Sequence, residues 1–517
     1  MPRPRLDAAL VRSDAFQRRA DLAAPAPEHL ALPERAVQFG TGALLRGLVD
    51  DLVDAANRAG TFGGRIVAIG STGSGRDRAI NEQDGLYTLV VQGLEGGRPK
   101  CELRVVSAVS RAISAADEWA AVLACARDPR LEVIFSNTTE VGIRMEEENP
   151  PSDSAPRSFP AKLARFLHER AQTFAYDATR GVVVVPCELI EDNGDRLKEL
   201  VLAHAARWAL EPAFARWVEA CVPFCNTLVD RIVPGAPKGD DAASLEATLA
   251  YEDALVTTCE PYSLLAIEGN DALRARLRFA EGAPGVIVTP SVAPYRERKV
   301  RLLNGAHTIL VPIALLVGCA TVCEAVEHEL VGRFLRRAML DELVPSLDAP
   351  GAEAFAHEVL ERFANPHIQH QLVDITLHGT TKMRVRVVPS VLAAGRAGRA
   401  PASLAFGFAA YLAFMRGEVH ARRRAAGLAV PDDTQGERVR ALWSGVAPDD
   451  EAALRALAAA ACADTELWGT DLASVPGFAE RVAEALVAIG RDGPAAALEA
   501  HLAAGAAASL TTPPEAR

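Results

Sequence analysis

The stretch Arg35-Ala-Val-Gln-Phe-Gly-Thr-Gly-Ala-Leu-Leu-Arg-Gly47 decides the fold of the first part of this chain. It begins as a short apolar strand, and the apolar residues after the glycines recur at helical spacing. Between them, Gly40 and Gly42 form a Gly-x-Gly turn, which lets backbone N–H groups approach a pyrophosphate at a helix N-terminus, where the helix dipole favours anions. The third glycine of the usual fingerprint is absent, because Leu45 stands there. The turn alone therefore also fits ordinary packing of a strand against a helix.

Three further stretches outward from this segment have the pattern of buried strands: residues 65–70, 131–136 and 181–186. Each is a short apolar run, and helical patterns separate them. Such alternation is typical of a mostly parallel sheet covered by helices on both faces. Ligands of these sheets bind beyond the carboxyl ends of the strands.

The pattern changes from about Tyr295 to long helical stretches rich in alanine and leucine. We therefore expect an α/β fold with a Rossmann-like dinucleotide-binding domain over residues 1–290. A mainly α-helical domain that carries substrate and catalytic residues is expected over residues 291–517.

Polar residues stand where the strands end. Asn137-Thr-Thr-Glu140 lies where a nicotinamide and its ribose would be held, although a polar loop after a buried strand has the same pattern. Ser71-Thr-Gly-Ser-Gly-Arg76 offers no carboxylate for the adenosine ribose before Asp77 appears. Because Arg76 and neighbouring hydroxyls can accept a 2′-phosphate, these residues leave the choice between NAD and NADP open. The predicted cofactor-binding residues are Phe39, Gly40, Gly42, Ser71, Asn137, Thr138 and Glu140.

A second polar group lies in Lys299-Val-Arg-Leu-Leu-Asn-Gly-Ala-His307. On a helix, spacings of five and then three residues place the Lys299 amine, the Asn304 amide and the His307 imidazole on roughly adjacent faces. A lysine facing a partly apolar pocket exchanges protons near neutral pH, and an alcohol or carbonyl oxygen is its natural partner. Taken singly, the three residues also fit a surface lysine, a capping asparagine and a core histidine.

Composition narrows the class of protein. Of 517 residues, 49% are hydrophobic, and 55 Lys+Arg against 67 Asp+Glu give a net charge of −12. No basic stripe is interleaved with aromatic residues, so nucleic acid is not an expected partner. The nine cysteines lack zinc-site spacing, which predicts reduced thiols and no metal. No apolar signal region follows the start, and Pro312 breaks the longest apolar run, so we expect a cytoplasmic protein with no membrane partner.

Several motifs, in order along nearly the whole chain, resemble the polyol-specific long-chain dehydrogenase/reductase family, of which mannitol dehydrogenase is the familiar member. They are the Gly40/Gly42 turn, Asn226-Thr-Leu-Val-Asp-Arg-Ile232, Cys259-Glu-Pro261, the Lys299/Asn304/His307 spacing and Lys382. Three segments most resemble the altronate oxidoreductase (tagaturonate reductase) branch: Ser136-Asn-Thr-Thr-Glu140, Pro186-Cys-Glu-Leu-Ile190 and Pro294-Tyr-Arg-Glu-Arg-Lys-Val-Arg301.

The resemblance implies a metal-independent secondary-alcohol dehydrogenase that uses NAD, with reduction of tagaturonate to altronate as the expected reaction. The alternatives are a mannitol or other polyol dehydrogenase or a mannonate (fructuronate) dehydrogenase, and, from another class, a non-catalytic nucleotide-binding scaffold. In the family's pattern Lys299 is the general acid and base, Asn304 donates to the developing alkoxide, and His307 orients the substrate oxygen or the lysine. Asp230 and Lys382 match substrate-contacting positions.

One triplet departs from the mannitol-type pattern. Mannitol-type members carry a second oxyanion asparagine in a Cys-Asp-Asn triplet, and this chain has Cys187-Glu-Leu189 there. Leucine cannot donate a hydrogen bond. We expect either that Asn193 reaches the substrate or that another group such as Glu188 reshapes the site for a different substrate. An ordinary Asn-Gly turn is the alternative interpretation of Asn193.

A uronate substrate adds a carboxylate, which needs cationic or N–H partners inside a pocket. Residues 367–386 are dense in such groups. We expect Lys382 to bind the carboxylate, with His378 or Arg384 as a helper, while Arg384 and Arg386 also fit surface ion pairs. The expected partner is a small sugar acid or polyol, and the sequence leaves the oligomeric state open.

Overall fold

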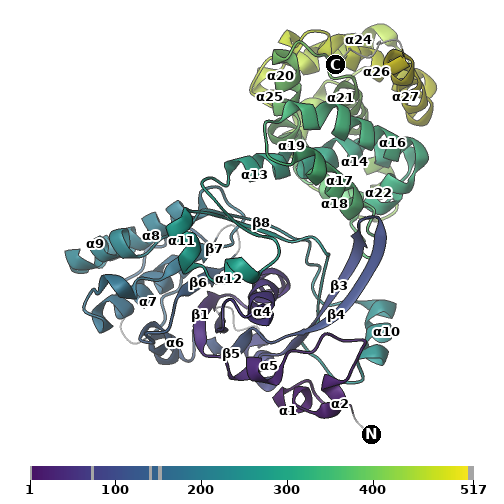
Figure 1. Ribbon diagram of the computed structural model, residues 1–517. Helices are drawn as coiled ribbons and strands as arrows, with labels where there is room; N and C mark the ends of the chain where they lie inside the picture. The colour runs from purple at the N-terminus through teal and green to yellow at the C-terminus, as the bar shows by residue number, and fades with distance from the viewer. Residues whose placement is uncertain (1–2, 71–74, 139–141, 150–153, 511–517) are drawn as a thin grey trace, which may run out of the picture. The chain divides into compact units, whose positions relative to one another are not determined.

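The chain forms two compact units, Met1–Val292 and Ala293–Arg517 (Figure 1). The computed structural model describes residues 3–70, 75–138, 142–149 and 154–510, with side-chain exposure described to residue 504. Unit 1 is built on a parallel sheet with helices, and unit 2 is helical. The predicted combination of a Rossmann-like α/β domain and a mainly α-helical domain is confirmed.

The central sheet of unit 1 has five parallel strands in the order β5-β2-β1-β6-β7. They are β1 Glu34–Phe39, β2 Arg65–Gly70, β5 Val109–Ser114, β6 Val133–Ser136 and β7 Val183–Pro186. Valine and isoleucine dominate these strands, as suits segments that are buried on both faces. Since β1 lies between β2 and β6, the chain runs to one side of β1 first and returns on the other side. The carboxyl ends of β1 and β6 are therefore the topological switch point, where ligands of such sheets bind.

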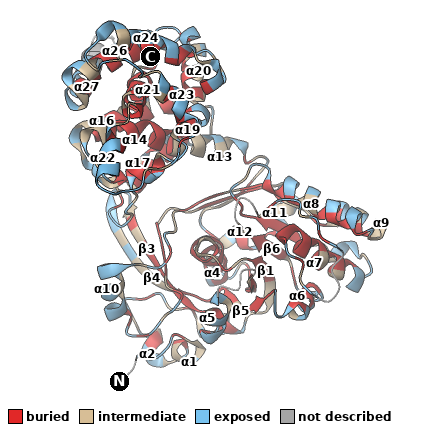
Figure 2. Ribbon diagram, turned by 180° about the vertical axis from the view of Figure 1, so that it is seen from behind, coloured by how far each residue is buried: buried red, intermediate tan, exposed pale blue. Residues whose placement is uncertain are grey.

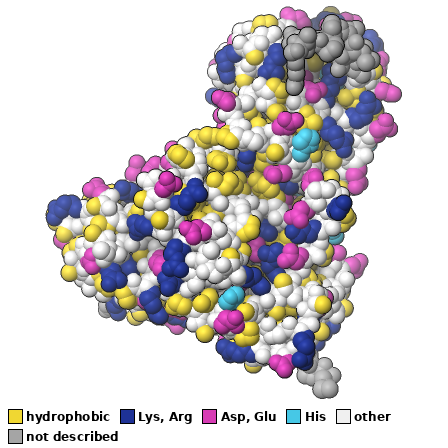
Figure 3. Space-filling view, viewed as in Figure 1, with side chains coloured by type: hydrophobic (Ala, Val, Ile, Leu, Met, Phe, Trp, Pro, Cys, Tyr) yellow, Lys and Arg dark blue, Asp and Glu magenta, His cyan; other side chains and the backbone are white. Residues whose placement is uncertain are grey.

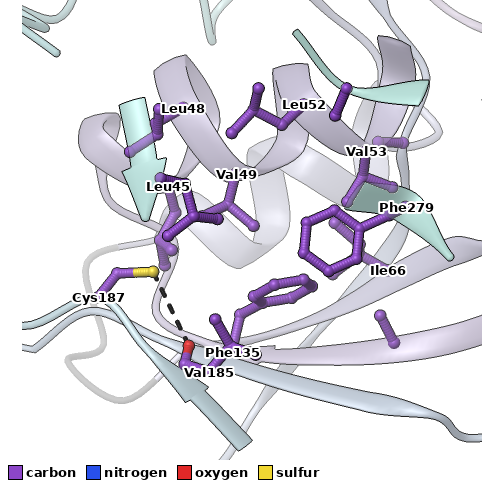
Figure 4. Packing of buried hydrophobic residues seen from close by; sticks show 14 of the residues in the cluster. Leu45, Leu48, Val49, Leu52, Val53, Ile66, Phe135, Val185, Cys187 and Phe279 are labelled. Atoms are coloured by element: carbon purple, nitrogen blue, oxygen red, sulfur yellow. Dashed lines mark hydrogen bonds between the residues drawn. The ribbon is translucent and has the colours of Figure 1, made fainter. Parts of the chain in front are cut away.

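Helices and strands cover both faces of this sheet. On one face, α3 Ala43–Leu45, η2 Arg46–Asp50 and α4 Asp51–Arg58 follow one another without a break. Figure 4 shows Leu45, Leu48 and Val49 from this helix above Phe135 and Val185 of the sheet. The other face is covered by α6 Trp119–Ala126, α7 Phe159–Thr173, α8 Asn193–Arg207 and α9 Pro212–Cys221.

Two three-stranded sheets complete unit 1. One has the order β11-β10-β8, with β8 Thr227–Asp230, β10 Leu264–Glu268 and β11 Val286–Thr289. The other has the order β4-β3-β9, with β3 Tyr87–Glu95, β4 Arg98–Val106 and β9 Thr257–Cys259. The remaining helices are α1 Ala8–Val11, α2 Asp14–Gln17, η1 Pro27–Ala31, α5 Arg76–Glu82, η3 Ala178–Arg180, α10 Gly239–Leu249, α11 Asp271–Arg276 and α12 Phe279–Gly282.

Unit 2 is organised around one long helix, made of α13 Ala293–Arg298, η4 Lys299–Asn304 and α14 Gly305–Val317 (Figure 2). By length and composition it is apolar enough to cross a membrane, but 78% of its most apolar window is buried in the structure, as in the core helix of a globular domain. It packs against α21 Ala402–Met415 and α19 Gly379–Arg386.

The other helices of unit 2 surround this core. They are α15 Val322–Glu327, α16 Glu329–Arg337, η5 Ala338–Leu343, η6 Val344–Ser346, α17 Ala352–Phe363, α18 Leu372–Ile375, α20 Val388–Arg396, α22 Glu418–Ala425, α23 Gly436–Ala441, α24 Glu451–Ala463, α25 Thr465–Trp468, η7 Leu472–Ser474, α26 Phe478–Asp492 and α27 Pro494–Leu510. On the face of the molecule in Figure 3, basic and acidic side chains are interspersed.

Candidate functional site

The glycine turn lies at the carboxyl end of β1, where the switch point of the sheet is. Gly40 has a φ of +129°, which side chains rarely allow, and a Cβ there would lie 2.9 Å from Leu45 Cδ1 and 3.1 Å from the Asn137 carbonyl oxygen. Gly42 has an ordinary φ of −70° and precedes α3, and a Cβ on it would meet no atom within 4 Å. Gly40 is therefore required by the fold, whereas Gly42 leaves open space before the helix N-terminus.

A buried carboxyl group holds the loop after β6. Glu188 accepts hydrogen bonds from the Ser136 hydroxyl (3.1 Å), the Thr138 N–H (3.0 Å) and the Thr138 hydroxyl (3.3 Å). The Asn137 amide donates to the Cys187 carbonyl oxygen at 2.7 Å. Burial raises the pKa of Glu188, against these hydrogen bonds. Glu188 thus holds the start of the loop after β6, which is the predicted nicotinamide-binding segment, by hydrogen bonds from its buried carboxyl group.

A cation and a carboxylate stand near the ends of β1 and β2. Arg76 Nη1 lies 3.5 Å from the Thr41 carbonyl oxygen in the glycine turn. Asp77 Cβ lies 3.6 Å from the place that a Cβ on Gly70 would take, so its side chain lies at the carboxyl end of β2. A carboxylate near this end of the second strand suits the ribose hydroxyls of a dinucleotide.

Of the predicted cofactor residues, Phe39 has a buried side chain. The Phe39 side chain is 1% exposed and packs against Phe159 and Phe166 with ring centroids 5.2 and 5.9 Å apart, so only its backbone borders the turn. Alternation along β1 turns this side chain into the core, so the predicted contact of Phe39 with the cofactor can come only from its backbone. Ser71 and Glu140 lie outside the described residues.

The Asn193 side chain makes its hydrogen bonds inside unit 1. Its amide donates to the carbonyl oxygens of Pro186 (3.2 Å) and Glu188 (3.0 Å) and to the Thr227 hydroxyl (3.0 Å), and its oxygen accepts from the Thr227 N–H. The side chain is 1% exposed. The expectation that Asn193 replaces the second oxyanion donor is therefore corrected: it ties β7 to β8. Leu189 by contrast, three residues after the end of the edge strand β7, is 57% exposed.

Asp230 is the last residue of β8 and is buried. Its neighbour Arg231 is held by Asp51 Oδ2 at 2.6 Å and by the carbonyl oxygens of Gly47 and Glu260. These bonds connect β8 to the helix that follows the glycine turn. The position of Asp230 is thus fixed by a buried ion pair next to it.

In unit 2, the Lys299-to-Asn304 segment is a π-helix, with the Gly305 N–H donating to the Val300 carbonyl oxygen five residues back. In an α-helix, five residues rotate the chain so that their side chains point about 140° apart. A π-helix has about 4.4 residues per turn, so residues five apart, such as Lys299 and Asn304, point within roughly 50° of each other. The expected helix is present, but its geometry brings two of the three residues closer than ordinary helical spacing implies.

His307 lies in the first turns of α14 and is 6% exposed. Its ring stacks on Phe363 at 3.9 Å with 9° between the planes, and His370 meets it edge-on at 5.2 Å. Burial first, and then the positive charges of His370, Arg386, Arg362 and Lys382, hold the pKa of His307 well below its usual range. Among the described residues, its Nε2 has no hydrogen-bond partner. A fixed, neutral imidazole with a free nitrogen is suited to a ligand hydroxyl.

Lys382 lies on α19 and donates to the Ile375 carbonyl oxygen at 2.9 Å. Burial and the nearby Arg386 lower its pKa, while Asp433 opposes them. A cavity of about 30 Å³ lined by Lys382, Tyr411, His420 and Asp433 lies beside it. That volume suits ordered water and not a six-carbon acid.

His378 and Arg384 do not share the surroundings of Lys382, and the expectation that Arg384 helps Lys382 to bind a carboxylate is corrected, because its guanidinium lies toward Gly469. His378 is exposed and begins α19 in the left-handed region, with its backbone N–H donating to the Asp432 carbonyl oxygen. Arg384 is exposed, and its guanidinium lies against Gly469 beside α25. Of the described cations near His307, the helices bring Lys382, Arg386 and Arg362 together instead.

Sequence reasoning missed Phe363, His370, Arg362 and Arg386 as neighbours of His307, and it named Glu188 without a partner. The first three come from α17 and the segment before α18, and no local pattern indicates which helix covers His307. Arg386 had a usable signal, because it follows Lys382 by four residues on the same helix face.

Comparisons with known proteins agree over about nine-tenths of the chain. Models of the mannitol dehydrogenase Rossmann domain and of the mannitol dehydrogenase C-terminal domain match residues 34–281 and 291–490. An altronate oxidoreductase of Yersinia enterocolitica is 41% identical over 474 residues, which cover 91% of this chain and 97% of that protein. An altronate oxidoreductase of Pectobacterium carotovorum is 42% identical over 479 residues, with the same coverage.

Two solved structures share the fold. The mannitol 2-dehydrogenase of Pseudomonas fluorescens, solved as a ternary complex with NAD and D-mannitol, covers 95% of this chain and 99% of its own at 22% identity and a TM-score of 0.65. A D-sorbitol dehydrogenase in substrate-free form covers 94% and 99% at 23% identity and a TM-score of 0.75. With both family models matched and relatives above 40% identity along nine-tenths of its length, the chain belongs to the mannitol dehydrogenase family.

Proposed function

We propose that this chain is an NAD-dependent secondary-alcohol dehydrogenase that interconverts tagaturonate and altronate. The observation that carries the proposal is the 41–42% identity with altronate oxidoreductases across 91% of the chain. The polyol dehydrogenases that share the fold are only 22–23% identical. Identity therefore favours a keto-uronate over a neutral polyol as the substrate.

The residues of unit 1 fit NAD. Gly42 leaves open space for a pyrophosphate at the start of a helix, and Asn137 and Thr138 are held beside the turn by Glu188 and neighbouring groups. Asp77 at the end of β2 suits an unphosphorylated ribose, while Arg76 is the residue that would accept a 2′-phosphate. When bound, NADH supplies the hydride for the carbonyl carbon.

Three side chains of unit 2 serve the oxygen of the reacting carbonyl. Lys299 donates its proton to this oxygen as the alcohol forms and takes it back in the reverse direction. The Asn304 amide, on the same side of the π-helix, donates a hydrogen bond to the developing alkoxide, a contribution of about 3 kcal/mol. His307 is held neutral and rigid on Phe363, so its free Nε2 is available to orient the substrate.

The substrate-binding roles fall to Asp230 and Lys382. Asp230, fixed at the end of β8, accepts from a substrate hydroxyl, and Lys382 lies among cations that suit a carboxylate. His378 is exposed and contributes less than Lys382. Asn193 is not among the proposed substrate-binding residues, because its side-chain amide already donates hydrogen bonds inside unit 1. A cytoplasmic location fits an enzyme that draws on the cellular NAD pool.

A substrate panel tests the proposal. Tagaturonate, fructuronate, fructose and D-tagatose are offered to the purified protein with NADH and NADPH in parallel. We expect tagaturonate with NADH to give the highest kcat/KM. Turnover of the neutral ketoses without turnover of either keto-uronate would contradict the assignment, and a preference for NADPH would overturn the cofactor.

A further inference from the structure

We propose that Arg386 is the residue that selects a carboxylate-bearing substrate, by binding the carboxylate with its guanidinium beside Lys382. This inference rests on the proposed function, since it names the group that tells a sugar acid from a neutral sugar at the same site. Neither the resemblance nor the pattern of the sequence assigned Arg386 to the site.

Arg386 lies next to the segment of unit 2 that carries Asn304 and His307. It ends α19 one helical turn after Lys382, so the two side chains lie on one face of the helix. Its carbonyl oxygen lies 3.1 Å from the place that a Cβ on Gly305 would take. The last turn of α19 is therefore packed directly against the helix that carries Asn304 and His307. The charge of Arg386 also acts on both Lys382 and His307.

The guanidinium of Arg386 lacks a counter-charge in the described part of the chain. No described carboxylate pairs with it, and burial is the single cause that lowers its pKa. The expectation of a surface ion pair is thus wrong for Arg386, whose side chain is neither fully exposed nor paired. A half-buried cation without an acidic partner costs free energy in the folded protein, and an anionic ligand removes that cost.

The other cations of this region differ in this respect. Lys382 already donates to the Ile375 carbonyl oxygen and is influenced by Asp433. Arg362 is buried and has interactions of its own. Arg384, two residues before Arg386, points to Gly469 on the α25 side. Arg386 is therefore the cation of α19 that is best placed to meet an incoming anion.

The chemistry of the guanidinium suits a carboxylate better than a hydroxyl. Its planar N–H groups match the two oxygens of a carboxylate in a bidentate pair, and the pair is strengthened where water is scarce. A neutral sugar has a CH2OH group at this place, which offers one oxygen in place of two and neutralises no charge. Arg386 thus discriminates against neutral ketoses as well as attracting keto-uronates.

Arg386→Gln, Arg386→Lys and the matched control Arg384→Gln test this. For each variant, kcat and KM are measured for tagaturonate and for NADH, together with the ratio of kcat/KM for tagaturonate over D-tagatose. We expect Arg386→Gln to raise the KM for tagaturonate roughly tenfold to hundredfold, the loss of a charge-assisted pair, and to lower the ratio similarly. The KM for NADH is expected to stay within about twofold, Arg386→Lys to recover part of the loss, and Arg384→Gln to behave as wild type.

Three results would overturn the inference. One is an unchanged KM for tagaturonate in Arg386→Gln. Another is an equal loss in Arg384→Gln, which would indicate a general effect of charge on α19. The third is a rise in the KM for NADH alone, which would mean that Arg386 binds a cofactor phosphate. If the wild-type protein does not reduce tagaturonate at all, the proposed function itself fails, and that result is seen before any variant is compared.

Discussion

At the scale of single residues, a ligand can bind only polar atoms that the fold does not already use in its own hydrogen bonds. Asn193 has its hydrogen bonds inside unit 1, whereas His307 keeps a buried, unpartnered Nε2 among the described residues. Such atoms are costly unless something binds them.

Lys299→Ala is expected to lower kcat by about two to four orders of magnitude, the usual contribution of a positioned general acid. NADH binding, followed by quenching of protein fluorescence or by calorimetry, is expected to stay near the wild-type value. Lys238→Ala, an exposed lysine before α10, is the matched control and is expected to be fully active. A Lys299→Ala protein with near wild-type kcat would rule out the proposed acid.

Glu188→Gln tests whether Glu188 holds the cofactor loop or contacts the substrate. The carboxyl group accepts three hydrogen bonds from Ser136 and Thr138, and an amide offers one oxygen and a misplaced NH2 donor to the same partners. We expect a several-fold rise in the KM for NADH and a smaller change in the KM for tagaturonate, measured by steady-state kinetics. The opposite pattern would show that Glu188 contacts the substrate and not the cofactor loop.

At the scale of elements, the π-helix at 299–304 sets the spacing between Lys299 and Asn304, the proposed catalytic side chains. Sequence periodicity predicted the helix and the residues, but it assumed ordinary α-helical rotation, because nothing in a pattern of apolar residues reports an extra residue in a turn. Alternation along β1, by contrast, could have placed Phe39 on the core face with Val37 from the sequence alone. The sequence could not predict which residues surround His307, since Phe363 and His370 come from distant segments.

Gly42→Ala tests the proposed pyrophosphate site at the glycine turn between β1 and α3. The backbone at Gly42 is ordinary and a Cβ there meets no atom within 4 Å, so the unfolding temperature is expected to stay within a degree or two. The methyl group would occupy space proposed for the pyrophosphate, and the KM for NADH is expected to rise at least about tenfold. Gly40→Ala is the contrasting variant, expected to lose stability because of its φ of +129°. Unchanged NADH binding in Gly42→Ala would place the pyrophosphate elsewhere.

At the scale of the whole molecule, buried histidines make stability depend on pH. Burial lowers the pKa of His501 from 6.5 to about 4 and also lowers those of His307, His370 and His420. Between those values the unfolded chain binds more protons at these histidines than the folded chain does, so the stability they contribute is full above pH 6.5 and falls as the pH drops toward 4. Asp50 acts in the opposite direction, because burial raises its pKa to about 7 and the folded chain keeps a proton that the unfolded chain has lost. The alternating strands and helices that predict the two-part architecture contain no information about this effect, because it depends on tertiary burial.

Thermal unfolding between pH 7.5 and pH 5.5 measures this dependence. We expect the unfolding temperature to fall across the range, and to fall less in His501→Leu, whose side chain can still pack on Phe406 without taking up a proton. A pH dependence as steep in His501→Leu as in the wild-type protein would contradict the burial of the His501 imidazole.

The central claim is that Lys299 and its neighbours reduce a keto-uronate with NADH and need no metal ion. The direct measurement uses chelator-treated wild-type protein, tagaturonate and NADH, with the product identified by chromatography against authentic altronate. We expect one altronate to form for each NADH oxidised, at the same rate with and without chelator. Loss of the activity on metal removal and its return with a divalent ion, or the formation of a product other than altronate, would contradict it.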